Sequence, residues 1–194
     1  MKEKETILFI NACLREKNSR TLQLANAFIS SIKSNDQYQI IERNITNLKE
    51  KPLTKNSFNP DGSQKNLNSS LAKEFALADQ ILIAAPFYEF TFPSVLAVYI
   101  ENISIPNITF KYTETGSEGL CKAKTLTYIY TLGGYLNSND KIGEQWLKRL
   151  SEFYGIKEFT TLVAAGLDVI GNDVNKIMDD ATKRAFLKGK EIFR

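Results

Sequence analysis

The residues best suited to chemistry form an aromatic loop that follows an apolar segment. Residues 80–85 form an apolar run of strand length that stops at Pro86, and Pro93 then opens a helical pattern. This order places the loop at the carboxyl end of a central strand, where open α/β sheets bind ligands. The loop continues with Phe87, Tyr88, Glu89 and Phe90. Its rings suit a flat, partly apolar cofactor such as a flavin, although they can also form an aromatic plug that covers the strand ends.

A second candidate site follows the first predicted strand. Residues 12–21 contain no glycine, so they match neither of the glycine-rich motifs that bind nucleotides. Ser19 and Thr21 offer hydroxyl groups beside the free backbone N–H groups of a helix start, and these are the parts of a phosphate site. Arg20 lies in the first turn, where the helix dipole favours an acid, and a bound anion would relieve that conflict. The alternative is simple capping by Asn18 or Ser19 beside a solvated arginine.

A third candidate site follows the fourth predicted strand, where the sequence contains two successive glycines. The residues concerned are Thr131, Leu132, Gly133 and Gly134. The glycines can simply form a turn. They can also let the backbone lie against the edge of a flat ring, because glycine has no Cβ.

The absence of histidine excludes several kinds of active site. A Ser-His or Cys-His couple is impossible, and the commonest zinc sites lose a ligand, so no metal site is predicted. Proton transfer must come from a carboxylate, tyrosine, lysine or water, or the chemistry must be left to a cofactor. The two cysteines, Cys13 and Cys121, stand in unrelated contexts and indicate reduced thiols in a cytoplasmic protein.

The size and composition of the chain predict one domain with one core over residues 1–194. The sequence is 43% hydrophobic, with 25 basic and 22 acidic residues and a net charge of +3. This balance is too mild, and the basic residues are too dispersed, to indicate nucleic acid as a partner. No apolar run approaches the roughly 20 residues that span a bilayer. The start of the sequence lacks the apolar region of a secretory signal, so we expect no membrane association.

Strand-like and helix-like segments alternate along the sequence, which predicts an α/β fold. The expected strands are residues 6–11, 38–43, 80–85, 126–132 and 158–165. The expected helices are residues 19–33, 67–77, 93–103, 142–153 and a final one from about residue 172, with a long polar loop at 45–66. Five strands favour a parallel, flavodoxin-like three-layer sandwich of order 2-1-3-4-5, because the Rossmann order needs a sixth strand. In that order, the loops after strands one, three and four surround one crevice.

Three motifs make the sequence resemble a known family. They are A-P-F-Y-E-F at 85–90, T-F-K-Y-T-E-T-G at 109–116 continuing to Gly119-Leu120, and T-L-G-G at 131–134. The second motif is the most specific, and residues 19–21 also match an S-x-[ST] phosphate loop. The sequence resembles the FMN-dependent NADH:azoreductases and quinone reductases of the flavodoxin-like superfamily. The similarity runs nearly end to end, with residues 45–70 loosely matched.

The resemblance implies which residues hold FMN. Ser19, Arg20 and Thr21 would hold its phosphate. The loop at 86–90 would lie against the isoalloxazine ring and present backbone groups to it. Residues 131–134 would contact the other side of the ring.

The resemblance also implies a two-step reductase. NADH or NADPH would pass a hydride to the flavin, and a quinone, azo compound or nitroaromatic would then take two electrons. Phe110 and Tyr112 in the second motif are candidate walls of the substrate pocket, or else they pack in an exposed hairpin. The family is usually homodimeric, with two FMN sites at the subunit interface.

Three residues depart from the family pattern. Cys13 stands where the family commonly has serine, so a weaker thiol donor would replace one hydroxyl at the phosphate. Glu89 stands at the asparagine of an M-Y-N-F loop, where an inward carboxylate would disfavour an anionic reduced flavin. Leu132 stands where an arginine often precedes the glycines. These departures leave open a flavin-binding regulatory protein with little turnover. A flavodoxin-like electron carrier is the other alternative, although such carriers are usually shorter and strongly acidic.

Overall fold

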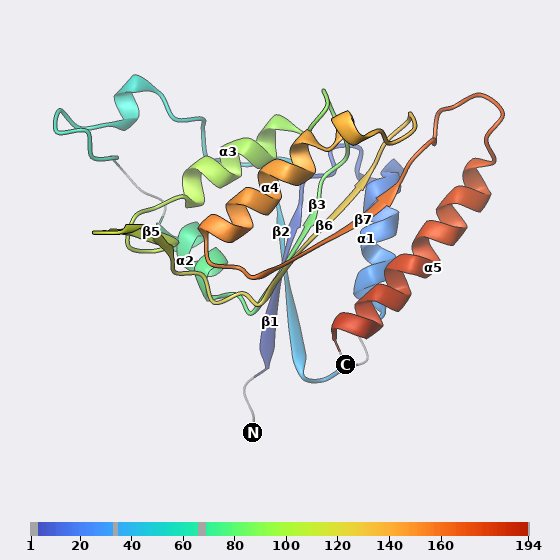
Figure 1. The fold of residues 1–194 in the computed structure, drawn as a ribbon, viewed down its shortest axis with the longest axis horizontal. Coiled ribbons are helices and arrows are strands. Elements are labelled where there is room, and N and C mark those ends of the chain that lie inside the picture. The colour runs from blue at the N-terminus through green and yellow to red at the C-terminus, as the bar shows by residue number, and fades with distance from the viewer. Residues whose placement is uncertain (1–3, 33–34, 66–68, 194) are drawn as a thin grey trace.

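The main sheet consists of five parallel strands. The computed structural model describes residues 4–32, 35–65 and 69–193. The five strands are β1 (Glu5–Asn11), β2 (Tyr38–Asn44), β3 (Gln80–Ala84), β6 (Thr125–Thr131) and β7 (Glu158–Ala164). Their order is β2-β1-β3-β6-β7, and every neighbouring pair is parallel (Figure 1). The predicted order 2-1-3-4-5 is confirmed, since β6 and β7 are the fourth and fifth strands of this sheet.

Helices cover both faces of the sheet and complete the three predicted layers (Figure 1). One face carries α1 (Arg20–Ser30) and α5 (Val174–Ile192). The other face carries α2 (Ser69–Leu77), α3 (Ser94–Ile103) and α4 (Ile142–Phe153). The described residues also form the short 3₁₀ helices η1 (Glu16–Asn18), η2 (Lys55–Ser57) and η3 (Ser138–Asp140). The predicted helix ends at residue 33 and at residues 67–68 lie outside the described residues.

The central strands are buried on both faces, as the apolar runs at residues 7–10 and 81–85 predict. In β1, Leu8 and Ile10 pack in the cluster on the side of α2, α3 and α4. Ile7 and Phe9 alternate with them and pack in the cluster on the side of α1 and α5. All residues of β3 and β6 are buried. This packing fixes the carboxyl edge of the sheet, and with it the loops that leave that edge.

A small hairpin lies outside the main sheet. Its strands, β4 (Phe110–Thr113) and β5 (Gly116–Gly119), pair antiparallel. They were not among the expected strands of the sheet, because each has only four residues and no apolar run marks them. An exposed hairpin was one of the two interpretations of Phe110 and Tyr112, and the structure has a hairpin there. Phe110 anchors the hairpin, since its ring centroid lies 4.6 Å from that of Phe153 in α4.

Local sequence signals mark the end of α4 and the start of α5 at the expected residues. Gly155 follows α4 with a φ of 85°, a left-handed conformation that favours glycine. The Asp173 side chain caps α5 by accepting a hydrogen bond of 3.0 Å from the Lys176 N–H.

Between β2 and α2, the described residues 45–65 contain η2 and otherwise irregular chain. None of the described helices combines the length and the apolar character of a membrane span.

Candidate functional site

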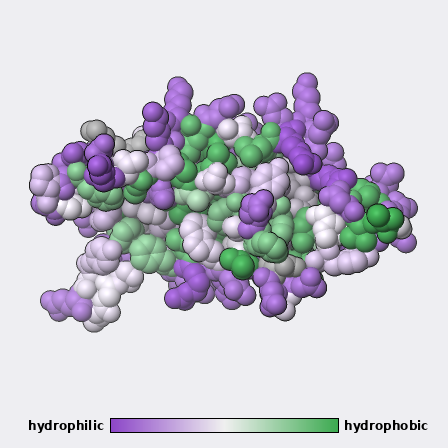
Figure 2. Space-filling model, turned by 90° about the horizontal axis from the view of Figure 1, so that it is seen from above, coloured by the Kyte–Doolittle hydropathy of each residue, from purple (hydrophilic) through white to green (hydrophobic). Residues whose placement is uncertain are grey.

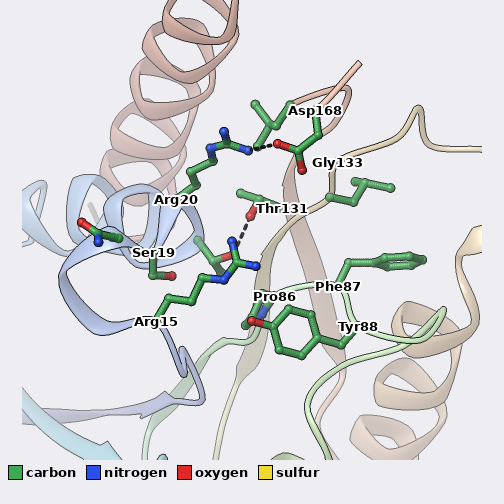
Figure 3. A pocket seen from close by; sticks show the side chains of 13 residues that line it. Arg15, Ser19, Arg20, Pro86, Phe87, Tyr88, Thr131, Gly133 and Asp168 are labelled. Carbon is green, nitrogen blue, oxygen red and sulfur yellow. Dashed lines mark hydrogen bonds and ion pairs between the residues drawn. The ribbon is translucent and has the colours of Figure 1, made fainter. Parts of the chain in front are cut away.

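A cavity of about 320 Å³ opens at the carboxyl ends of the central strands (Figure 3). It brings together the three loops that the sequence singles out, after β1, β3 and β6, and adds the loop after β7. The residues that line it are Arg15, Asn18, Ser19, Arg20, Thr21, Pro86, Phe87, Tyr88, Thr131, Leu132, Gly133, Leu167 and Asp168. The expectation of one crevice at this edge of the sheet therefore agrees with the geometry.

The start of α1 forms one end of the cavity. Ser19 is the N-cap, and its Oγ accepts a hydrogen bond of 3.1 Å from the Leu22 N–H, so Ser19 rather than Asn18 caps α1. No acidic residue lies in the first turn of this helix. Thr21 is buried, and its Oγ1 lies 2.6 Å from the Oγ1 of Thr131. Hydroxyl groups, helix N–H groups and a positive potential therefore face this end.

The aromatic loop forms the other end of the cavity. The Phe87 N–H donates to the Thr131 carbonyl at 3.1 Å, which ties the loop to the end of β6. Tyr88 and Thr91 exchange backbone hydrogen bonds of 3.3 and 2.8 Å across a tight turn. The two residues between them, Glu89 and Phe90, have φ values of 48° and 64°. The turn carries both side chains into solvent, whereas Phe87 and Tyr88 line the cavity.

Gly133 leaves room for a neighbouring side chain beside the cavity. An added Cβ at Gly133 would lie 2.5 Å from Oδ2 of Asp168, so the glycine makes room for that carboxylate. Asp168 in turn accepts a hydrogen bond of 2.7 Å from Nη1 of Arg20. Arg20 is thus ion-paired, although its side chain remains 38% exposed to solvent. Gly134, the next residue, has no atom within 4 Å of an added Cβ and does not line the cavity.

Six of the candidate residues from the sequence do not line the cavity. They are Cys13, Glu89, Phe90, Phe110, Tyr112 and Gly134. Cys13 is buried, and its Sγ donates to the Ala84 carbonyl at 3.5 Å. Burial raises the pKa of this thiol to about 11, so Cys13 is a neutral thiol at physiological pH.

The hairpin that carries Phe110 and Tyr112 lies away from the strand ends that surround the cavity (Figure 1). Phe110 is buried, whereas Tyr112 is 76% exposed. Within one chain, the structure does not bring these two rings to the cavity.

Four cavity residues were not among the predicted site residues. They are Arg15, Asn18, Leu167 and Asp168. Asn18 was weighed as a helix cap alone, and Arg15 lies in the same loop. Leu167 and Asp168 follow β7, which neighbours β6 in the predicted order, so that order could have added the loop after β7. No motif marks Asp168 as a partner of Arg20, because 148 residues separate them.

The part of the chain that the structure describes holds no group of three metal-ligating side chains placed to bind a metal ion. The charged side chains that line the cavity are Arg15, Arg20 and Asp168. The site therefore combines an end suited to an anion with an end lined by aromatic rings, and its ligand is expected to have both characters.

Comparison with known proteins agrees with this geometry. Residues 5–186 match a family model described as the flavodoxin-like fold. The chain belongs to this family. Curated relatives include the FMN-dependent NADH:quinone oxidoreductase 2 of Clostridium acetobutylicum, 33% identical over 95% of this chain and 98% of that protein. An FMN-dependent NADH:quinone oxidoreductase of Clostridium perfringens is 35% identical over the same shares of the two chains.

A solved structure has the same architecture. The FMN-dependent NADH-azoreductase of Bacillus anthracis, determined in complex with FMN, matches with a TM-score of 0.85 and 25% sequence identity. The match covers 98% of this chain and all of that one.

Proposed function

We propose that this chain is an FMN-dependent NAD(P)H oxidoreductase that reduces quinones, azo compounds or nitroaromatics. The observation that carries the proposal is the cavity at the carboxyl edge of the sheet, with an anion-binding end at α1 and an aromatic end after β3. The curated relatives that cover nearly the whole chain are oxidoreductases that use FMN and NADH. They favour the reductase over an electron carrier or a regulatory flavoprotein.

The residues of the cavity fit both halves of FMN. The phosphate would lie at the start of α1, where Ser19, Arg20 and Thr21 begin the helix. The ring system would lie toward Phe87 and Tyr88, with residues 131–133 on its other side. The basic end, rich in hydroxyl groups, matches the phosphate of FMN. The aromatic end matches its flat ring system.

Bound FMN would supply the redox chemistry, taking a hydride from NADH or NADPH and passing two electrons to the acceptor. The protein would position the rings and exclude water. The hydrogen bond from the Phe87 N–H to the Thr131 carbonyl holds the aromatic loop against the end of β6 for this purpose. A chain without histidine suits such a reaction, because no acid-base side chain is required at the ring.

We also propose a homodimer with its two FMN sites at the subunit interface. Several large hydrophobic side chains are exposed, including Phe90 at the tip of the aromatic loop and Ile142 and Trp146 on α4. Figure 2, which looks onto the molecule from above Figure 1, shows hydrophobic side chains along the middle of this face among hydrophilic ones. A second copy would bury apolar surface that a monomer leaves in water.

Light scattering after size exclusion tests the dimer. The expected mass is twice that of one chain, and Trp146→Asp should shift it toward the monomer. A single-chain mass at micromolar concentration would contradict the dimer.

A cytoplasmic location and a single domain over residues 1–194 stay predictions from the sequence.

Steady-state oxidation of NADH and NADPH by the FMN-loaded protein tests the reductase. Menadione and an azo dye serve as acceptors, and free FMN without protein gives the background rate. We expect turnover of at least one nucleotide with at least one acceptor. A protein that binds FMN and oxidises neither nucleotide would instead be a carrier or a regulatory flavoprotein.

A further inference from the structure

The two arginines that line the cavity differ in their partners. Arg20 reaches from α1 to the loop after β7, where its Nη1 donates to Oδ1 of Asp168 at 2.7 Å (Figure 3). Among the residues that the structure describes, the side chain of Arg15 makes no ion pair and no hydrogen bond. Figure 3 shows the Arg15 guanidinium pointing into the cavity, on the same side as Ser19. One guanidinium is therefore committed to a carboxylate, and the other is available to a ligand.

This difference determines which arginine is free to pair with a phosphate. The described residues contribute three charged side chains to the cavity lining, and Asp168 compensates Arg20, which leaves Arg15 as the uncompensated positive charge among them. A phosphate that approached the Arg20 guanidinium would meet the Asp168 carboxylate already bonded to it, and two anions close together repel each other. Arg15 offers the same fork of N–H donors without that competitor.

We propose that Arg15 is the residue that pairs with the phosphate of the cofactor, and that Asp168 holds the Arg20 side chain as part of the cavity wall. The proposal rests on the proposed function, because it takes FMN as the ligand. The backbone N–H of Arg20, in the first turn of α1, still serves the same phosphate. Arg15 then sets the preference of the cavity for FMN over riboflavin, which has the same ring and no phosphate.

Flavin binding by the FMN-free protein tests this assignment. Quenching of flavin fluorescence gives the dissociation constants of FMN and of riboflavin separately. Arg15→Gln should weaken FMN binding by about 10- to 100-fold, the usual value of a hydrogen bond to a charged group. The same variant should leave riboflavin binding within about threefold of wild type, because riboflavin has no charge for Arg15 to bind. The salt dependence of FMN binding should also decrease in Arg15→Gln.

Three further variants separate charge at the site from charge in general. Lys17→Gln removes the same charge from the same loop, at a residue that does not line this cavity, and should bind FMN like wild type. Arg20→Gln should weaken FMN binding less than Arg15→Gln does. Asp168→Asn releases Arg20 toward the phosphate and should tighten FMN binding by about 3- to 10-fold, an effect that disappears in the double variant with Arg20→Gln.

Several outcomes would overturn the assignment. Unchanged FMN binding by Arg15→Gln, or a larger loss with Arg20→Gln, would make Arg20 the charge partner of the phosphate. Equal weakening of FMN and riboflavin by Arg15→Gln would give Arg15 a structural role. If the wild-type protein binds neither flavin, the proposed function itself fails, and that result is distinct from all the others.

Discussion

The side-chain oxygens of Thr21 and Thr131 lie 2.6 Å apart in the wall of the cavity. This hydrogen bond joins the first turn of α1 to the last residue of β6, across 110 residues of sequence. Thr21 and Thr131 are 1% and 8% exposed, so water cannot easily replace either partner. The bond therefore fixes the end of the cavity at α1 to the strand that leads into the glycines.

Thr131→Val tests this connection with a side chain of nearly the same shape. The variant leaves the buried Thr21 hydroxyl without its partner, so the free energy of unfolding should fall by about 1–2 kcal/mol. FMN affinity should fall as well, because the start of α1 loses its anchor. Thr131→Ser keeps the hydroxyl and is the matched control. Urea unfolding curves that coincide for the valine and serine variants would show that the bond contributes nothing.

Glu89→Asn should stabilise the protein. Glu89 has a φ of 48° and Phe90 a φ of 64°. A non-glycine residue in this left-handed region destabilises the folded state by about 1–2 kcal/mol, but asparagine adopts the region at little cost. We expect the free energy of unfolding to rise by about 1 kcal/mol. Glu89→Gln removes the same charge without the preference for a left-handed backbone, so it should leave stability unchanged. An equal gain in both variants would assign the effect to charge.

Gly119→Ala should destabilise the fold at the β4–β5 hairpin. An added Cβ would lie 2.0 Å from the carbonyl carbon of Tyr154, and backbone atoms cannot move aside as a side-chain end can. The expected cost is about 3 kcal/mol, at the upper end for overpacking. Gly134→Ala is the control, because no atom lies within 4 Å of its added Cβ. Thermal unfolding compares the two, and similar midpoints would contradict the close packing of the hairpin.

Asp79 should make stability depend on pH in the acid range. Burial alone would raise the pKa of this carboxyl, but hydrogen bonds from Lys122 and from the Thr6 N–H outweigh burial and lower the pKa overall. A lowered pKa in the folded state means that the stabilisation is complete above the unfolded pKa of about 4 and is lost as pH falls through the folded value.

Urea unfolding of wild type and Asp79→Asn at several pH values measures this contribution. At pH 7 the variant should be less stable by about 1–3 kcal/mol, and the difference should shrink below about pH 4 as Asp79 of the wild type becomes protonated. A difference that stays constant between pH 7 and pH 3 would contradict the assignment.

Apolar patterning accounts for the predicted part of the fold. The apolar run of β3 marks a strand buried on both faces, whereas β6 combines apolar residues with three threonines. The count of five strands, with helices between them, favours the observed sheet order. The same order brings the loops around Ser19, Phe87 and Gly133 to one edge, as the cavity shows. The β4–β5 hairpin lacks such a run. The contact of Phe110 with Phe153 of α4 holds the hairpin in place, and apolar patterning does not reveal a contact of this kind.

The details of the site depend on contacts between distant residues, which the sequence does not reveal. The pairing of Arg20 with Asp168 joins the segment after β1 to the loop after β7, and the glycine at position 133 makes room for the Asp168 carboxylate. The left-handed backbone at Glu89 carries its carboxylate into solvent, although the sequence alone allowed it to point inward.

The most direct test of the whole account is a titration of the FMN-free protein with FMN, followed by quenching of flavin fluorescence. We expect saturable binding of one FMN per chain. We also expect that protein isolated with its cofactor releases FMN when it is denatured. Flavin fluorescence that stays unquenched at a large excess of protein, together with a colourless isolated protein, would contradict it.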